Sequence, residues 1–159
     1  MSDEKKVMTA DETNNQTRAH IIMVRNFLNL MVIKLLRRGE LHDQTKLEQP
    51  ELDIFTEFTP KLAGSTYGSD EYEGFRAAMK PALDHHYAKN RHHPEHFKDG
   101  INDMNLLDLI EMFCDWKAAT LRHNDGNIKK SIETNQKRFG MDHQMTQIFL
   151  NSIELLEDD

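Results

Sequence analysis

Histidine is concentrated in one stretch of the sequence, and this concentration is the first sign of chemistry. The 159-residue chain has nine histidines, and five of them lie between positions 85 and 96: His85, His86, His92, His93 and His96. Imidazole nitrogen is a good ligand for zinc, iron, manganese and nickel, and carboxylates add charge and suit harder ions. The first hypothesis is therefore a metal site.

A His42-Asp43 pair lies at a polar junction between two expected helices. Adjacent residues inside a regular helix diverge by roughly 100° and seldom serve one ion, whereas a junction can turn both toward one cavity. Upstream, His20 lies on an apolar helical face, which on its own indicates a core histidine. Downstream, Asp115 follows Glu111 in an otherwise apolar helix, which on its own indicates a solvated acidic stripe. The case for a site depends on the residues together.

In order along the chain, His20, His42-Asp43 and Asp115 resemble the H…HD…D motif of the HD phosphohydrolase superfamily, and their spacing is similar to that of its more compact members. The segment HDQTK at residues 42–46 is similar to the HDxGK form of this motif, with Thr45 in place of glycine. The segment DWKAA at residues 115–119 resembles the DxxxA form at the last ligand.

From about residue 17 to 155 the chain also resembles a family of small phage and bacterial proteins described as a domain of unknown function. The matching segments are HH at 85–86, Asn90, HHPEH at 92–96 and EMFCDW at 111–116. The extra histidines are similar to those of HD-GYP phosphodiesterases and HD-type di-iron oxygenases, where such residues hold a second metal ion. The GYP signature is absent, which argues against cyclic-dinucleotide specificity.

The HD resemblance implies metal ligands at particular positions of this sequence. The implied ligands of a first ion are His20, His42, Asp43 and Asp115. The candidates for a second ion, to which Asp43 would bridge, are His86, His92 and His93. His86 is preferred to His85 because neighbours on one helix cannot both face one ion, and the choice between His92 and His93 stays open. Surface positions are expected for His96, His123 and His143.

The resemblance further implies one or two divalent ions, with iron, manganese, nickel, cobalt and zinc not distinguished, and two catalytic residues. Lys46 stands where some HD nucleotidases carry an acid, and it fits the HDxGK enzymes, in which the lysine faces a substrate phosphate. Glu111 is a candidate proton acceptor or a partner of a ligand histidine. We expect a metal-dependent phosphohydrolase acting on a nucleotide or another small phosphate ester. The alternatives are an HD-type di-iron oxygenase and a noncatalytic metal- or nucleotide-binding protein.

Composition limits the partners. The formal net charge of −7 argues against binding to duplex nucleic acid or to an anionic membrane. Cys114 is the single cysteine, which favours a reducing cytosol, and no apolar run is expected to reach membrane-spanning length. The predicted location is the cytoplasm of a bacterium or of a phage-infected host. Composition leaves a homo-oligomer open.

The expected elements are all helical. Apolar residues at helical spacing predict an all-α fold with no strand, and the HD resemblance implies a compact HD-like bundle of about six to seven helices. Residues 1–15 are predicted to be a disordered lead-in and residues 16–157 a single domain, with a surface loop at 61–70. Pro81 should kink or divide the third helix. The helices are predicted at 17–38, 50–58, 71–90, 104–123, 127–138 and 142–157.

Overall fold

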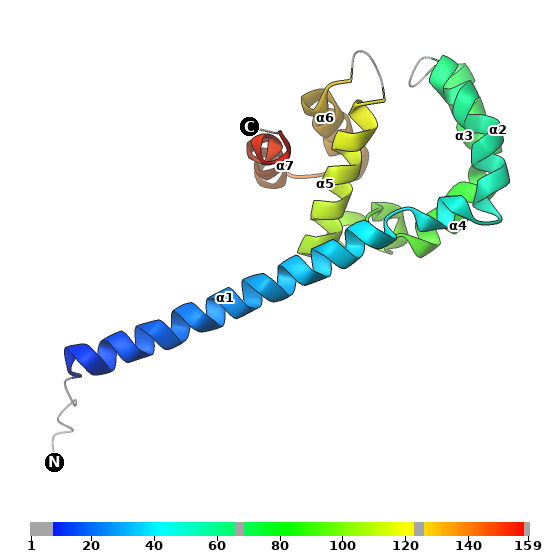
Figure 1. The fold of residues 1–159 in the computed structure, drawn as a ribbon. Helices are drawn as coiled ribbons and strands as arrows, with labels where there is room; N and C mark the ends of the chain where they lie inside the picture. Colours follow the sequence, from blue (N-terminus) through cyan, green and yellow to red (C-terminus); the bar gives the residue numbers. More distant parts are fainter. Residues whose placement is uncertain (1–7, 66–68, 123–125, 158–159) are drawn as a thin grey trace. The chain divides into compact units, whose positions relative to one another are not determined.

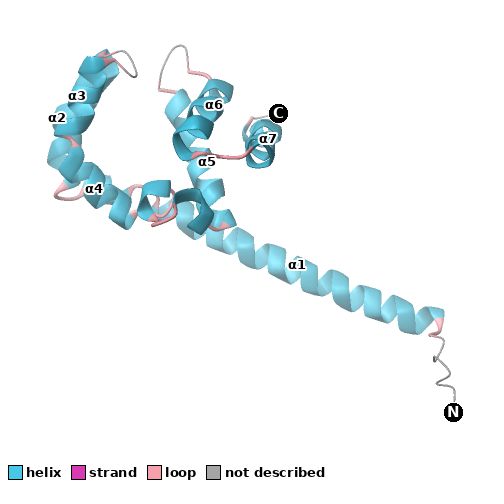
Figure 2. Ribbon diagram, turned by 180° about the vertical axis from the view of Figure 1, so that it is seen from behind, coloured by secondary structure: helices cyan, strands magenta, loops and turns pink. Residues whose placement is uncertain are grey.

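The computed structural model describes residues 8–65, 69–122 and 126–157, and every regular element in these ranges is helical (Figures 1 and 2). Seven α-helices and four short 3₁₀ helices are present in the described chain, so the all-α prediction is confirmed. The chain divides into two compact units, Met1–Glu40 and Leu41–Asp159. The prediction of one domain over 16–157 stays a prediction.

The first unit is formed by the long helix α1, Ala10–Leu41, whose last residue belongs to the second unit (Figure 1). It begins earlier than the predicted Thr17, so the expectation of disorder is wrong for residues 10–15. The reason is a reciprocal cap. The Glu12 amide donates to the Thr9 hydroxyl at 3.2 Å, and the Thr9 amide donates to the Glu12 carboxylate at 2.9 Å. The T-x-x-E spacing of this capping box was a readable signal.

Helix α1 has no buried residue, and large apolar side chains such as Ile21, Phe27 and Leu36 are exposed on it. By length and composition alone, one helical stretch of the described chain, Ala10–Leu47, which contains α1 and η1, could cross a membrane. The expectation that no apolar run reaches that length is therefore wrong. The core helix of a soluble protein passes the same test, so the cytoplasmic location stays a prediction.

The second unit carries six α-helices in its described part. They are α2 Glu51–Gly64, α3 Asp70–Ala78, α4 Lys80–Lys89, α5 Leu106–Thr120, α6 Ile128–Phe139 and α7 His143–Asn151. The 3₁₀ helices are η1 Gln44–Leu47, η2 Pro94–His96, η3 Gly100–Asp103 and η4 Ile153–Leu156. Helix α2 packs against η1, α3 and α4, while α5 packs on α6 and α6 on α7.

Two prolines have different effects on the helices of this unit. The helix predicted at 50–58 continues through Pro60 to Gly64 as α2, so the predicted loop at 61–70 is wrong for residues 61–64, and residues 66–68 lie outside the described chain. Contacts of α2 with its neighbours offset the backbone hydrogen bond that Pro60 removes. Pro81 instead lies in the first turn of α4, where a proline fits, and the predicted helix is divided at Met79.

An apolar core joins α5, α6 and α7. Its buried members are Met112, Phe113, Ile128, Ile132, Met141, Phe149 and Ile153. The same helix α5 carries Glu111 and Asp115, so one helix contributes to the core and to the polar cluster described next.

Candidate metal centre

The backbone at Asp43 turns the chain out of α1 and into η1. Asp43 has φ 57° and ψ 13°, a left-handed conformation, and it is the one non-glycine residue with positive φ in the described chain. Aspartate tolerates this conformation better than most residues. A residue held in a sparsely populated conformation is often found at a functional site, and here it is the residue on which the surrounding side chains converge.

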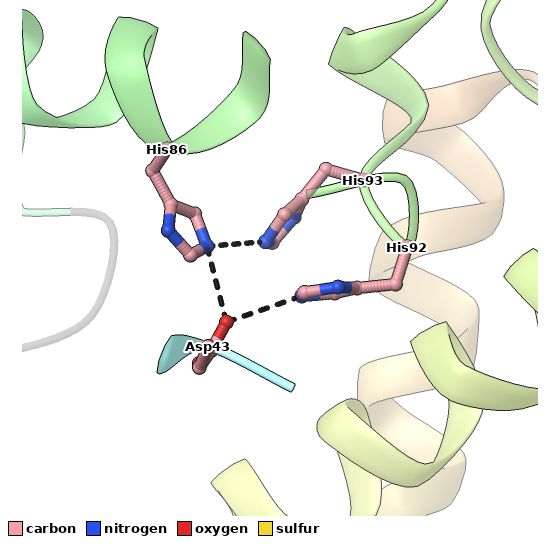
Figure 3. A group of neighbouring side chains, drawn as sticks. All are labelled: Asp43, His86, His92 and His93. Atoms are coloured by element: carbon pink, nitrogen blue, oxygen red, sulfur yellow. Dashed lines mark hydrogen bonds and ion pairs between the residues drawn. The ribbon is translucent and has the colours of Figure 1, made fainter. Parts of the chain in front are cut away.

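Three histidines gather around one oxygen of Asp43 and form what we call the histidine subsite: Asp43, His86, His92 and His93 (Figure 3). The Oδ1 atom of Asp43 lies 3.2 Å from Nε2 of His86 and 3.4 Å from Nε2 of His92. Nε2 of His86 lies 3.0 Å from Nε2 of His93. His86 comes from α4 and the other two from the segment after it, and one ligand atom from each residue lies within 4.8 Å of the others.

The other oxygen of Asp43 belongs to a second group, the acidic subsite, formed by His42, Asp43 and Asp115. Nε2 of His42 lies 3.4 Å from Oδ2 of Asp43 and 3.7 Å from Oδ1 of Asp115. Asp43 is thus common to both subsites through different oxygens, which is the arrangement that a bridging carboxylate requires.

Glu111 lies behind two of these histidines. Its Oε1 atom is 3.0 Å from Nδ1 of His42 and 3.1 Å from Nδ1 of His92. Contact through Nδ1 leaves Nε2 of each ring directed at Asp43. The sequence allowed two roles for Glu111, a proton acceptor or a partner of a ligand histidine, and this geometry favours the second.

Glu51 holds a similar position behind His86, and sequence reasoning missed it. Its side chain is fully buried, with Oε2 at 2.9 Å from Nδ1 of His86 and Oε1 at 2.7 Å from Nδ1 of His85. His85 therefore faces Glu51, and His86 faces Asp43. An acid in the first turn of a helix ordinarily complements the helix dipole, so the sequence held no distinguishing signal for this role.

An ion pair between exposed Arg91 and buried Asp108 anchors the segment that carries His92 and His93. The carboxylate of Asp108, fully buried at the start of α5, accepts from Nε of Arg91 at 3.2 Å and from Nη2 at 3.0 Å. The backbone of Asn105 donates to the same carboxylate, which also serves as a helix cap. This pairing fixes the residue next to His92 to the helix that carries Glu111.

The cluster contains buried polar atoms whose hydrogen-bonding capacity is not met. Oδ1 of Asp43 and both ring nitrogens of His92 are buried and have no hydrogen-bond partner. His92 lies near two carboxylates, but without hydrogen-bond geometry. An unmet buried polar group costs about 1–3 kcal/mol. A divalent cation among these nitrogen and oxygen atoms would remove this cost, so the residues fit a metal ion of the kind bound by histidine and carboxylate.

The charges of the acidic subsite depend on close pairing. Contact with the carboxylates of Asp115 and Glu111 raises the pKa of His42 to about 10. Burial acts to raise the pKa of Asp115, but the interaction with His42 outweighs it, and the pKa of that carboxyl is lowered. The ring of His42 therefore carries positive charge where a bound cation would carry it.

The pKa values of Asp43 and His93 are both lowered, for different reasons. Burial acts to raise the pKa of Asp43, but the contact with the His86 ring and the charge of Lys46 hold it well below its usual range. Burial, followed by the charges of His92 and His86, lowers the pKa of His93 to about 3. A neutral His93 and an ionised Asp43 are the protonation states in which these side chains bind metals.

Lys46 lies directly against the cluster. Its Nζ atom is 2.5 Å from Oδ2 of Asp43 and 5.4 Å from the centre of the Phe55 ring. The ammonium group is thus beside the carboxylate shared by both subsites. Its predicted contact with a substrate phosphate stays a prediction.

The other predicted histidines have different positions. His20 is an exposed residue of α1 in the first unit, and its assignment as a ligand stays a prediction. His143 is exposed at the start of α7, as expected. His96 is half-buried, and its Nδ1 donates to the Tyr87 carbonyl at 2.8 Å, so its prediction as a plain surface residue is wrong. His123 lies outside the described residues.

Comparison with known families gives one match. The model of a family of unknown function, DUF5662, matches residues 9–157. This is most of the chain, so the chain belongs to that family. No curated protein and no solved structure matched in the other two comparisons. The family has no assigned function, so a reaction must be inferred from the side chains themselves.

Proposed function

We propose that this member of the family is a metal-dependent phosphohydrolase that acts on a nucleotide or another small phosphate ester. The observation that carries the proposal is the convergence on Asp43: its two carboxylate oxygens face separate histidine-containing groups, and Oδ1 is buried without a hydrogen bond. Two adjacent cation sites that share a carboxylate suit displacement at phosphorus, where charge on several oxygens must be neutralised together.

Each side chain has a distinct task in this proposal. His42, Asp43 and Asp115 would hold one ion, and Asp43, His86, His92 and His93 would hold a second. When bound, such ions polarise a phosphoryl oxygen and lower the pKa of a coordinated water. Glu111 holds the ring of His42 by a hydrogen bond at Nδ1 and lies 3.1 Å from Nδ1 of His92.

Lys46 supplies the charge that favours phosphate over other substrates. Cations bound to Asp43 would repel its ammonium group, which would then need another anion within reach. A phosphate bound next to the cluster provides that anion, and the lysine stabilises negative charge on the phosphoryl oxygens. The half-buried position of Lys46 beside Asp43 supports this role.

The test is phosphate release from a panel of nucleotides and simple phosphate esters, with the metal content of the protein determined in parallel. Protein purified without added metal is compared with protein loaded with manganese, cobalt, nickel, zinc or iron. We expect metal-dependent release of phosphate from at least one substrate.

Two other results would replace the proposal. Oxygen consumption by the reduced iron form, with no phosphate release by any metal form, would favour a di-iron oxygenase built on the same side chains. Metal or nucleotide binding without either reaction would favour a noncatalytic binding protein.

A further inference from the structure

A buried carboxylate outside both subsites receives three hydrogen bonds. Glu51, the first residue of α2, is 0% exposed, although ionised side chains are seldom fully buried without partners. Its Oε2 accepts from the Thr45 hydroxyl at 3.0 Å and from Nδ1 of His86 at 2.9 Å, and its Oε1 accepts from Nδ1 of His85 at 2.7 Å. None of these contacts is explained by helix capping.

The contacts with Glu51 decide which nitrogen of His86 carries a proton. If Nδ1 of His86 carried a lone pair, it would face a buried carboxylate oxygen at 2.9 Å, and two acceptors would be forced together. With the proton on Nδ1, the lone pair of Nε2 faces Oδ1 of Asp43, 3.2 Å away, and lies toward His93. A cation between Nε2 and Oδ1 would satisfy both of these acceptors, whereas the contact of Nδ1 with fully buried Glu51 at 2.9 Å leaves no place for a cation on that side of the ring.

Neighbouring groups complete the same pattern. The two hydrogens of the Asn90 side-chain amide are directed to the Thr45 hydroxyl at 2.9 Å and to the His86 carbonyl at 2.9 Å, so its nitrogen, although 3.0 Å from Nδ1 of His86, requires no lone pair there. The Thr45 hydroxyl is then free to donate to Glu51. The hydrogen bonds run in one direction, from Asn90 through Thr45 to Glu51, so that Glu51 accepts from every neighbour.

We infer that Glu51 is a positioning residue that holds His86 with its proton on Nδ1 and its Nε2 free to bind a cation beside Asp43. The inference deepens the proposed function, because it rests on the metal centre, but it does not depend on the reaction that the centre carries out. Carboxylates that hold ligand histidines in this way typically account for 10–100-fold in metal affinity.

The first experiment needs no variant. Long-range ¹H–¹⁵N spectra of the full-length metal-free protein at pH 8 report which nitrogen of each histidine is protonated. We expect His86 to carry its proton on Nδ1. A proton on Nε2 of His86 would overturn the inference, and this result decides it even if no variant folds.

The second experiment removes the charge of Glu51 while keeping its shape. Glu51→Gln removes the negative charge and leaves one accepting oxygen in place of two, so His85 and His86 can no longer both donate to it. We therefore expect a changed proton pattern of His85 or His86 and a 10–100-fold loss in Co²⁺ affinity by titration calorimetry. The control is Glu57→Gln on the same helix, where Glu57 is exposed and pairs with Lys61 at 2.7 Å. It should change neither measurement.

A folded Glu51→Gln variant with an unchanged proton pattern and Co²⁺ affinity within twofold of wild type would also overturn the inference. Failure of the proposed function has a different result. If wild type binds Co²⁺ and shows the expected His86 pattern but releases no phosphate, the reaction is wrong and the role of Glu51 stands. If wild type binds no metal, the spectra still decide the position of the proton.

Discussion

Helix α5 has two buried faces, one apolar and one acidic. One face places Met112 and Phe113 in the apolar core with α6 and α7. The other carries Asp108, Glu111 and Asp115, which are three and four residues apart and therefore lie on one side of the helix. An acidic face of this kind is ordinarily solvated, but here Asp108 is fully buried and Glu111 has only 10% of its side chain exposed.

The comparison separates the residues of α5 that stabilise the fold from those that form the candidate site. Apolar side chains gain free energy from burial itself, so the core face needs nothing but close neighbours. Carboxylates lose free energy on burial unless cations or donors compensate them. Asp108 is compensated by Arg91, whereas Glu111 and Asp115 face histidines that in turn surround Asp43. Substitutions on the two sides should therefore fail in different assays.

The largest effect on the polar side is expected for Asp43→Ala. Because Asp43 belongs to both subsites, its loss should remove most bound metal and all metal-dependent phosphate release. Metal content by elemental analysis is the measurement, and Asp84→Ala, on exposed Asp84 of α4, is the control. Full metal content in Asp43→Ala would show that Asp43 is not a ligand.

Replacing His92 and His93 together with Gln should affect the histidine subsite alone. We expect the metal-to-protein ratio to fall, because the histidine subsite should bind its ion 10–100-fold more weakly or worse. The circular dichroism spectrum should be unchanged. His143→Gln, at an exposed position of α7, should leave the ratio unchanged. Equal ratios in the two variants would remove the case for a second ion.

The opposite pattern is expected for Ile132→Ala in the core. Ile132 is 0% exposed, and removing its buried side chain should lower the free energy of unfolding by about 2–5 kcal/mol. Urea unfolding of the metal-free protein measures this change. The folded variant should retain the wild-type metal-to-protein ratio, and a loss of metal would show that the two sides of α5 are coupled.

The contrast between the two faces also explains what could be predicted from sequence. Helical periodicity was enough for the all-α class, because apolar spacing reports directly on burial. The capping box at Thr9 was a signal in the sequence, whereas the continuation of α2 through Pro60 depends on contacts with other helices. Local patterns cannot report such contacts.

The candidate site divides in the same way. His42, Asp43 and Asp115 could be grouped because their order resembles a known motif, and the histidine-rich segment supplied His86, His92 and His93. Glu51 has no such motif. Its role depends on the approach of α2 to α4, which brings it to residues more than thirty positions away, as the 34-residue separation from His85 shows.

The effect most specific to phosphate, with no loss of metal or stability, is expected for Lys46→Met. Methionine keeps most of the aliphatic stem but removes the ammonium group, which lies 2.5 Å from Oδ2 of Asp43 and 5.4 Å from the centre of the Phe55 ring. Metal content should be retained, because a cation is not a ligand. If the lysine stabilises charge on a phosphoryl oxygen, kcat/KM for phosphate release should fall on the order of 10²-fold, or about 2.7 kcal/mol, as for loss of one electrostatic donor.

Lys61→Met is the matched control, since Lys61 is a lysine of α2 that also lies over a phenylalanine ring, that of Phe58 at 4.4 Å. Unchanged hydrolysis by Lys46→Met would keep the enzyme class but exclude this lysine from the site, and the charge on phosphate would then have to be met by the metal ions alone.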